Sequence, residues 1–218
     1  MKLSILIATL GQREERFKRL LDALLPQVDK YDDIEVIAYW NNFERPLVEI
    51  RQALLNQAKG EYVCFIDDDD TVPNYYCDEI MQRLDGVDYV GWQMQLYTNG
   101  EKAKPTYHSL RYSNWHDDED GYYRNVSHLN PIKREIALKA GFSSKEGVPE
   151  DYDWANRVGS LVKTENYIDK VMYYYHHTAD DSHWAGGKAL KDWERPNIIN
   201  KHFNWHPDSK ENFSWAHH

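Results

Sequence analysis

Apolar runs alternate with amphipathic stretches in the first third of the chain. Three short runs are almost continuously apolar, which predicts strands buried on both faces: residues 3–8, 34–39 and 62–66. Between them, residues 13–25 and 46–58 place apolar side chains at helical spacing, and we expect Pro26 to end the first helix. This alternation predicts a parallel, doubly wound sheet whose ligands bind at the carboxyl ends of its strands.

The pattern is less regular beyond residue 86. Residues 87–97 are predicted to form a strand, and the polar residues 98–127 a long loop with some hairpin. Residues 131–140 and 150–160 have helical spacing, and the tyrosine-rich residues 167–176 are typical of a strand.

The composition narrows the classes of function. The net charge of -10 disfavours a bulk nucleic-acid binder, although it leaves room for a local basic patch. Aromatic residues make up 14%, a share that suits both ordinary packing and the stacking of flat ligands such as bases and sugars. The two cysteines, Cys64 and Cys77, make no disulfide framework. The N-terminus is typical of a first strand rather than a signal peptide, and no apolar stretch reaches the ~20 residues that span a bilayer, so we expect a soluble, cytoplasmic protein.

Four consecutive aspartates, Asp67 to Asp70, follow the third predicted strand directly. Carboxylates are the hard oxygen ligands that Mg²⁺ and Mn²⁺ prefer, and such metals usually arrive with substrate phosphates. Alternate residues of an extended segment point the same way, so Asp67 and Asp69 are expected to face one site. The equally acidic residues 117–120 follow no strand, and we interpret them as solvated surface.

Three stretches resemble family 2 glycosyltransferases with the GT-A fold: SILIATLGQRE, RQALLNQAKGEYVCFIDDDD and KAGFSSKEGVPEDYDWANRV. They occur in the family's order. The resemblance implies an α/β, GT-A-like single domain, with a mostly parallel Rossmann-like sheet flanked by helices and an irregular acceptor-side region. It covers residues 1–185, and residues 186–218 are expected to be a C-terminal extension packed on the same domain.

The resemblance also implies a donor site. Asp67 would hold the ribose or the phosphates of a nucleotide sugar, Asp69 would bind Mn²⁺ or Mg²⁺, and Asp68 or Asp70 would assist. Thr9 and the backbone after it would line the nucleotide site. Arg51 would lie near the base or the diphosphate, or would instead form a salt bridge with an acid.

Further along the chain, the resemblance makes Asp151 the general base, with Glu150 beside it. His177, or its neighbour His176, falls where some members supply a late metal or phosphate ligand. The family commonly has an acidic residue after its second strand to read uracil. Here Asn41, or the asparagine after it, takes that place, which leaves the identity of the base open. Ala8 stands where the family usually has proline.

The implied reaction is an inverting, metal-dependent transfer from a nucleotide-diphospho-sugar, a UDP-sugar in the first instance, to an acceptor hydroxyl. The acidic balance favours a glycan acceptor over a hydroxymethylated nucleic-acid base. Basic and aromatic residues near the C-terminus keep the nucleic-acid alternative open: Trp184, Lys188, Lys191, Trp193, Arg195, Lys201 and Trp205.

Two alternatives from other classes stay open. The segment FIDDDDTV also fits the signature of haloacid-dehalogenase-type phosphatases, in which Asp67 would be the nucleophile. In those enzymes, however, the aspartate usually follows the first strand of the domain. The other alternative is a non-catalytic sugar- or nucleotide-binding domain, which the presence of Asp151 disfavours.

Overall fold

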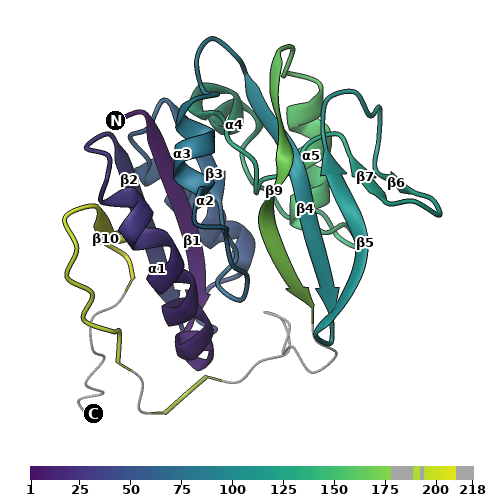
Figure 1. Cartoon of the computed structure of the whole chain (residues 1–218). Coiled ribbons are helices and arrows are strands. Elements are labelled where there is room, and N and C mark those ends of the chain that lie inside the picture. Colours follow the sequence, from purple (N-terminus) through teal and green to yellow (C-terminus); the bar gives the residue numbers. More distant parts are fainter. Residues whose placement is uncertain (178–188, 192–193, 210–218) are drawn as a thin grey trace.

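The computed structural model describes residues 1–177, 189–191 and 194–209 of the chain (Figure 1). One large mixed sheet runs through it, with helices on both faces. This confirms the predicted α/β class and the central sheet flanked by helices. Three residues of the expected basic and aromatic tail surface, Trp184, Lys188 and Trp193, lie outside the described residues.

The first half of the sheet has the predicted parallel arrangement. Strand β1 (Leu3–Leu10) lies between β2 (Ile34–Asn41) and β3 (Tyr62–Phe65), and both pairs are parallel. All described residues of β2 and β3 are buried, as the continuous apolar runs predict. The carboxyl ends of the three strands therefore share one edge of the sheet.

The helices form two layers. The first covers one face: α1 (Glu14–Val28) and α3 (Tyr76–Met81). The second covers the other: α2 (Leu47–Gln57), α4 (Arg134–Ala140) and α5 (Glu150–Gly159). Because side chains alternate along a strand, β1 sends Leu3, Ile5 and Ile7 into the first core and Leu6 into the second.

The second half of the sheet is mixed. Its long strands are β4 (Tyr89–Thr98), β5 (Glu101–His108) and β9 (Glu165–His177); β4 pairs with β5 antiparallel and with β9 parallel. Three shorter strands complete this half: β6 (His116–Asp117), β7 (Tyr122–Arg124) and β8 (Ile132–Lys133). The prediction of a long loop with some hairpin over residues 98–127 is therefore confirmed in part: β6 and β7 form an antiparallel pair there, but the longer strand β5 was not predicted. Alternation along β5 is weak, and its exposed lysines and Pro105 hide the strand signal.

Other predictions also need correction. Helix α1 continues through Pro26 to Val28, because a proline near the end of a helix disturbs few of its hydrogen bonds. Helix α3 was not predicted. Strand β10 (Phe203–Trp205) was not predicted either; it pairs parallel with β2, and Trp205 packs against Phe17 and Trp40.

Candidate functional site

Two of the four aspartates after β3 are structural anchors. Asp68 is buried and accepts hydrogen bonds from the Leu10 backbone N–H at 3.1 Å and from Arg13 at 2.9 Å. Asp70 is fully buried and accepts from the Tyr173 hydroxyl at 2.8 Å and the His176 backbone N–H at 2.7 Å. The run is thus tied to the end of β1 on one side and to β9 on the other.

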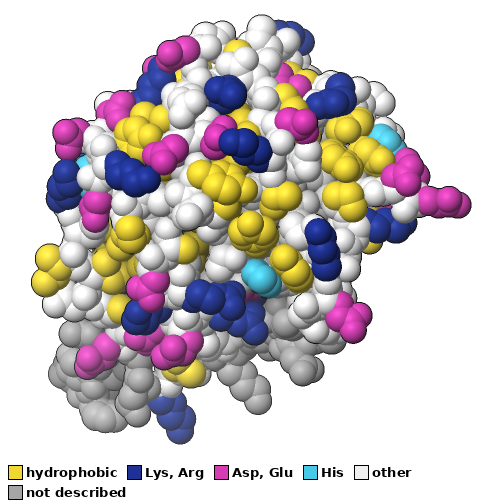
Figure 2. All heavy atoms as spheres, viewed as in Figure 1, with side chains coloured by type: hydrophobic (Ala, Val, Ile, Leu, Met, Phe, Trp, Pro, Cys, Tyr) yellow, Lys and Arg dark blue, Asp and Glu magenta, His cyan; other side chains and the backbone are white. Residues whose placement is uncertain are grey.

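Asp69 lies close to Arg13, just before α1, and to Arg16 and Arg19 of α1. Its Oδ2 is 3.1 Å from Arg13 and 3.8 Å from Arg16, and Arg19 donates to its carbonyl oxygen at 2.9 Å. Figure 2 shows Lys and Arg side chains gathered between the lower ends of α1 and β9. Burial, and then the charge of the neighbouring Asp68, raises the pKa of Asp69 to about 7, although Arg13 acts to lower it.

Asp67 takes part in an ion-pair triad that we call the Arg51 clasp: Arg51, Asp67 and Glu150. The Arg51 side chain is 6% exposed, and its two terminal nitrogens reach Asp67 at 3.1 Å and Glu150 at 2.8 Å. Burial alone would raise the pKa of Asp67, but His128 and then Arg51 hold it below its usual range. The clasp joins the end of β3 to the start of α5. Arg51 thus forms the acid contacts that were one of its two expected roles.

The first turn of α5 presents three acids in different surroundings. Glu150 pairs with Arg51, and Asp153 pairs with Arg157 at 3.0 Å. Asp151 forms no ion pair with any described residue, and its carboxylate accepts a hydrogen bond from the backbone N–H of Tyr152 at 2.7 Å. Its place at the second residue of α5 agrees with the predicted helix N-terminus, where the helix dipole favours a carboxylate.

Asp151 and Asp67 both line a cavity of about 370 Å³, which we call the Asp151 cavity. It lies between α5 and the face formed by β4, β5 and β7. Aromatic and polar side chains make up much of its wall: Thr106, His108, Trp115, Tyr122, Arg124, Ser127, His128 and Tyr175.

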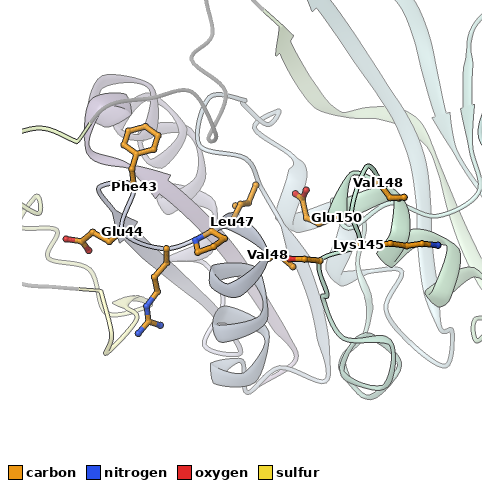
Figure 3. Close-up of a pocket in the computed structure, with 10 residues that line it drawn as sticks. Phe43, Glu44, Leu47, Val48, Lys145, Val148 and Glu150 are labelled. Carbon is orange, nitrogen blue, oxygen red and sulfur yellow. The ribbon is translucent and has the colours of Figure 1, made fainter.

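A larger cavity of about 760 Å³, the α2 cavity, lies on the other side of the Arg51 clasp. Figure 3 shows Leu47 and Val48, at the start of α2, opposite Lys145, Val148 and Glu150 from the α4–α5 loop and the start of α5. The turn after β2 also lines this cavity. Glu150 lines this cavity and Asp67 lines the other, so the clasp lies between them.

The remaining predicted residues have varied surroundings. Thr9 is fully buried at the end of β1. Asn41 is also fully buried, and both ends of its side-chain amide bond the backbone of Arg45. His177 is exposed at the end of β9, whereas His176 contacts Thr71 at 3.2 Å and stacks on Tyr97. Base reading by Asn41 and metal binding by His177 stay predictions.

Several residues of the site were not predicted from the sequence: Arg13, Trp115, Arg124, His128 and Tyr175. All except Arg13 line the Asp151 cavity. Trp115, Arg124 and His128 come from segments with weak patterns, and no motif marks them. Arg13 lies within SILIATLGQRE and Tyr175 within the predicted strand over residues 167–176, but no role was predicted for either. The expectation of solvated surface for residues 117–120 is confirmed, since all four are exposed.

A sequence comparison relates part of the chain to a known family. Residues 42–142, from the end of β2 to just after α4, match the model of glycosyl transferase family 2. This segment is similar to that family. The matched segment contains the aspartate run and Arg51 and ends before α5. No curated protein matches the sequence.

The fold of this chain agrees with that of solved structures. It is similar to S. aureus TarS 1–349, with a TM-score of 0.56 and 18% identity over 81% of this chain and 60% of that one. The TarS 1–349 complex with UDP-GlcNAc gives a TM-score of 0.58 and 17% identity over 87% and 62%. The TarS 1–349 complex with UDP gives a TM-score of 0.57 and 18% identity over 81% of this chain and 60% of that one. The chain thus spans about three fifths of the TarS 1–349 structures and has their GT-A-like fold. None of the helices within the described residues is long and apolar enough to cross a membrane.

We predict that Arg51→Met destabilises the protein by about 3 kcal/mol, because it leaves Asp67 and Glu150 as unpaired, half-buried carboxylates. Urea unfolding at pH 7.0 measures the change. Lys201→Met is the control: it removes a cation from an exposed pair with Asp32 and should change little. Equal effects of the two substitutions would show that the clasp adds no stability.

We predict a loss of stability in acid that depends on His108. Burial, offset in part by a hydrogen bond to Asn130, lowers the pKa of His108 to about 4 from an ordinary 6.5. As pH falls, His108 takes up a proton in the unfolded chain before it does so in the folded protein. The contribution of neutral His108 to the free energy of unfolding is therefore fully present above pH 6.5 and is lost by pH 4, a loss of roughly 3 kcal/mol.

His108→Gln should remove this part of the pH dependence while it keeps a polar partner for Asn130. Unfolding free energies at pH 7, 5.5 and 4 measure it, with the exposed His116→Gln as the control. A pH profile for His108→Gln that is parallel to the wild type would contradict the prediction.

Proposed function

We propose that this chain is an inverting glycosyltransferase that moves a sugar from a nucleotide-diphospho-sugar to an acceptor hydroxyl, with Asp151 as the general base. One observation carries the proposal: Asp151 shares a cavity with Asp67, while its neighbours Glu150 and Asp153 are paired with arginines. A carboxylate without a cation partner accepts a proton more readily than one in an ion pair. The similarity of residues 42–142 to glycosyl transferase family 2 supports the reaction class.

The donor is proposed to be a UDP-sugar. TarS 1–349 has been solved with UDP-GlcNAc and with UDP, and it shares the fold of this chain. The carboxyl ends of β1, β2 and β3 are where nucleotides bind in open α/β sheets, and the α2 cavity opens beside the end of β2. In this arrangement the nucleoside occupies the α2 side of the Arg51 clasp, and the transferred sugar lies towards Asp151.

A divalent cation, Mg²⁺ or Mn²⁺, is proposed to bind at Asp67 and Asp69. His177, at the end of β9, is the further ligand predicted from the sequence. Among the described residues no group of three or more His, Cys, Asp or Glu could hold a metal by itself. That donor set still fits Mg²⁺ or Mn²⁺, which proteins often bind with one or two carboxylates and the phosphates of a substrate. Burial and the neighbouring charge of Asp68 raise the pKa of Asp69, and a bound cation would favour its charged form. A bound cation would offset the charge that grows on the leaving diphosphate.

Side chains of this protein have separate roles in the proposed reaction. Asp151 takes the proton of the acceptor hydroxyl as the hydroxyl oxygen bonds to the anomeric carbon. At the same time the bond between the anomeric carbon and the diphosphate oxygen breaks, and its electron pair stays with the diphosphate. Attack from the face opposite the leaving group inverts that carbon. Arg13 and Arg16 place positive charge beside Asp69, on the side of the leaving group.

The acceptor is proposed to be a glycan, with a hydroxymethylated nucleic-acid base as the alternative. The haloacid-dehalogenase alternative has less support, because Asp67 follows the third strand of the sheet and lies in the segment that matches family 2. Cytoplasmic location stays a prediction.

A thermal-shift panel with UDP-, GDP- and TDP-sugars, each with and without Mn²⁺, tests the donor. We predict that a UDP-sugar with Mn²⁺ raises the melting temperature, and that Asp69→Ala abolishes this shift while Asp118→Ala keeps it. Both variants remove one aspartate from an acidic run, but Asp118 lies in an exposed segment. If no nucleotide sugar stabilises the protein, or if both variants respond alike, the donor site is elsewhere.

We predict that Asp151→Asn lowers turnover by a factor of ~10² to 10⁴ and leaves donor binding unchanged, because asparagine cannot accept the proton. Asparagine keeps the size of the side chain at the start of α5, so a purely structural role predicts little loss. Asp153→Asn is the matched control on the same helix. Initial rates of UDP release at saturating donor measure the effect. Near-normal turnover by Asp151→Asn would place the base on another residue.

A further inference from the structure

The Asp151 cavity is lined by charged side chains of both signs: Asp67, Asp151 and Arg124 from β7. Trp115 and Tyr122 lie beside Arg124 and line the same space. The proposed reaction uses the acids alone and gives Arg124 no task.

Arg124 is a half-buried cation in an aromatic setting. Its guanidinium carbon is 5.0 Å from the ring centre of Trp115 and 5.8 Å from that of Tyr122. Nη1 donates to the backbone oxygens of His116 at 3.0 Å and Tyr123 at 2.9 Å. No described carboxylate comes within ion-pair distance of it.

The charge of Arg124 is therefore incompletely balanced. Asp117 is close enough to favour the charged form of Arg124, but Asp117 is exposed and burial outweighs its effect, so the pKa of Arg124 is lowered. A guanidinium of this kind presents a planar set of donors that matches phosphate and carboxylate oxygens.

His128 is a second observation that points to a ligand. It lines the same cavity at 5% exposure, and its Nε2 is buried without a hydrogen-bond partner among the described residues. The nearest carboxylate oxygen, Oδ1 of Asp67, is 3.8 Å away. Buried polar atoms usually have partners, and a hydroxyl of a bound ligand would provide one here.

We propose that the Asp151 cavity binds the acceptor as an anionic sugar unit, one that carries a phosphate or carboxylate, and that Arg124 pairs with this anionic group. The inference rests on the proposed function and names its acceptor class. The acceptor hydroxyl lies on the Asp151 side, its ring stacks on Trp115 and Tyr122, and its anionic group lies on Arg124. The volume of about 370 Å³ is in the range of small-ligand sites.

A nucleic-acid acceptor is the other source of phosphate, and the structure favours the sugar. The net charge of -10 repels a polyanion, whereas a single anionic group needs only one local cation. Within the described residues, the cavity has one arginine among its lining residues and no lysine.

Binding of matched sugars, followed through tryptophan fluorescence, tests the proposal without turnover. The probes are glucose, glucose 6-phosphate and glucuronate, each added to the full chain with and without UDP and Mn²⁺. We expect both anionic sugars to bind at least ~10-fold more tightly than glucose, as one charge-assisted contact provides. Arg124→Gln should remove this preference, and Arg124→Lys should keep part of it.

Arg111→Gln is the matched control, because Arg111 also stacks on tyrosines, at 4.3 Å from Tyr167, but does not line the cavity. It should keep the preference for anionic sugars. Melting temperatures establish that each variant is folded, and Arg124→Lys tests the charge if Arg124→Gln unfolds.

Several outcomes would overturn the proposal: equal binding of glucose and the anionic sugars, no binding of either anionic sugar, or an unchanged preference in Arg124→Gln. Arg124-dependent binding of a duplex with a hydroxymethylated base, with no binding of the sugars, would assign the cavity to nucleic acid instead. Loss of UDP-sugar binding in the donor panel, with anionic sugars still bound through Arg124, would refute the proposed function and leave the anion site in place.

Discussion

The pairing of Arg51 with Asp67 and Glu150 is the interaction on which the site depends. A nearly buried guanidinium between two carboxylates is stable only as a set, since removing one member leaves charge without a partner in a poorly solvated space. The set joins three elements: α2, the end of β3 and the start of α5. Through it, the aspartate run and the helix that carries Asp151 keep one relative position.

The same clasp lies between two cavities. The α2 cavity on one side is lined by the turn after β2. The Asp151 cavity on the other side is lined by the mixed half of the sheet. In the proposed transfer the nucleoside occupies the first cavity and the acceptor the second, and Asp67 lies at the boundary where the two substrates meet. Under this proposal the parallel half of the sheet serves the donor and the mixed half serves the acceptor.

Charge balance explains why four aspartates can follow one another. Asp68 and Asp70 are buried and satisfied by Arg13 and the backbone of Leu10 in one case, and by Tyr173 and the backbone of His176 in the other. They hold the run in place. Asp67 pairs with Arg51, and Asp69 pairs with Arg13, just before α1, so cations from two elements balance the two more exposed aspartates.

Local pattern determined a large part of this protein. The apolar runs and helical spacings predicted β1, α1, β2, α2 and β3, because burial imposes a periodicity that shows within each segment. The position of the aspartates after β3, and of Asp151 at the start of α5, followed from the same patterns and from the family resemblance. Tertiary structure alone decided the rest. Arg51 and Glu150 are 99 residues apart, so no periodicity relates them, and only packing makes Glu150 a paired acid and leaves Asp151 without a cation partner among the described residues. Likewise β5 pairs with the edge of β4 and β7 with the edge of β5, and this pairing brings Arg124 to the cavity. Pairing between distant segments depends on which surfaces meet, and the spacing of residues along one segment does not contain that information.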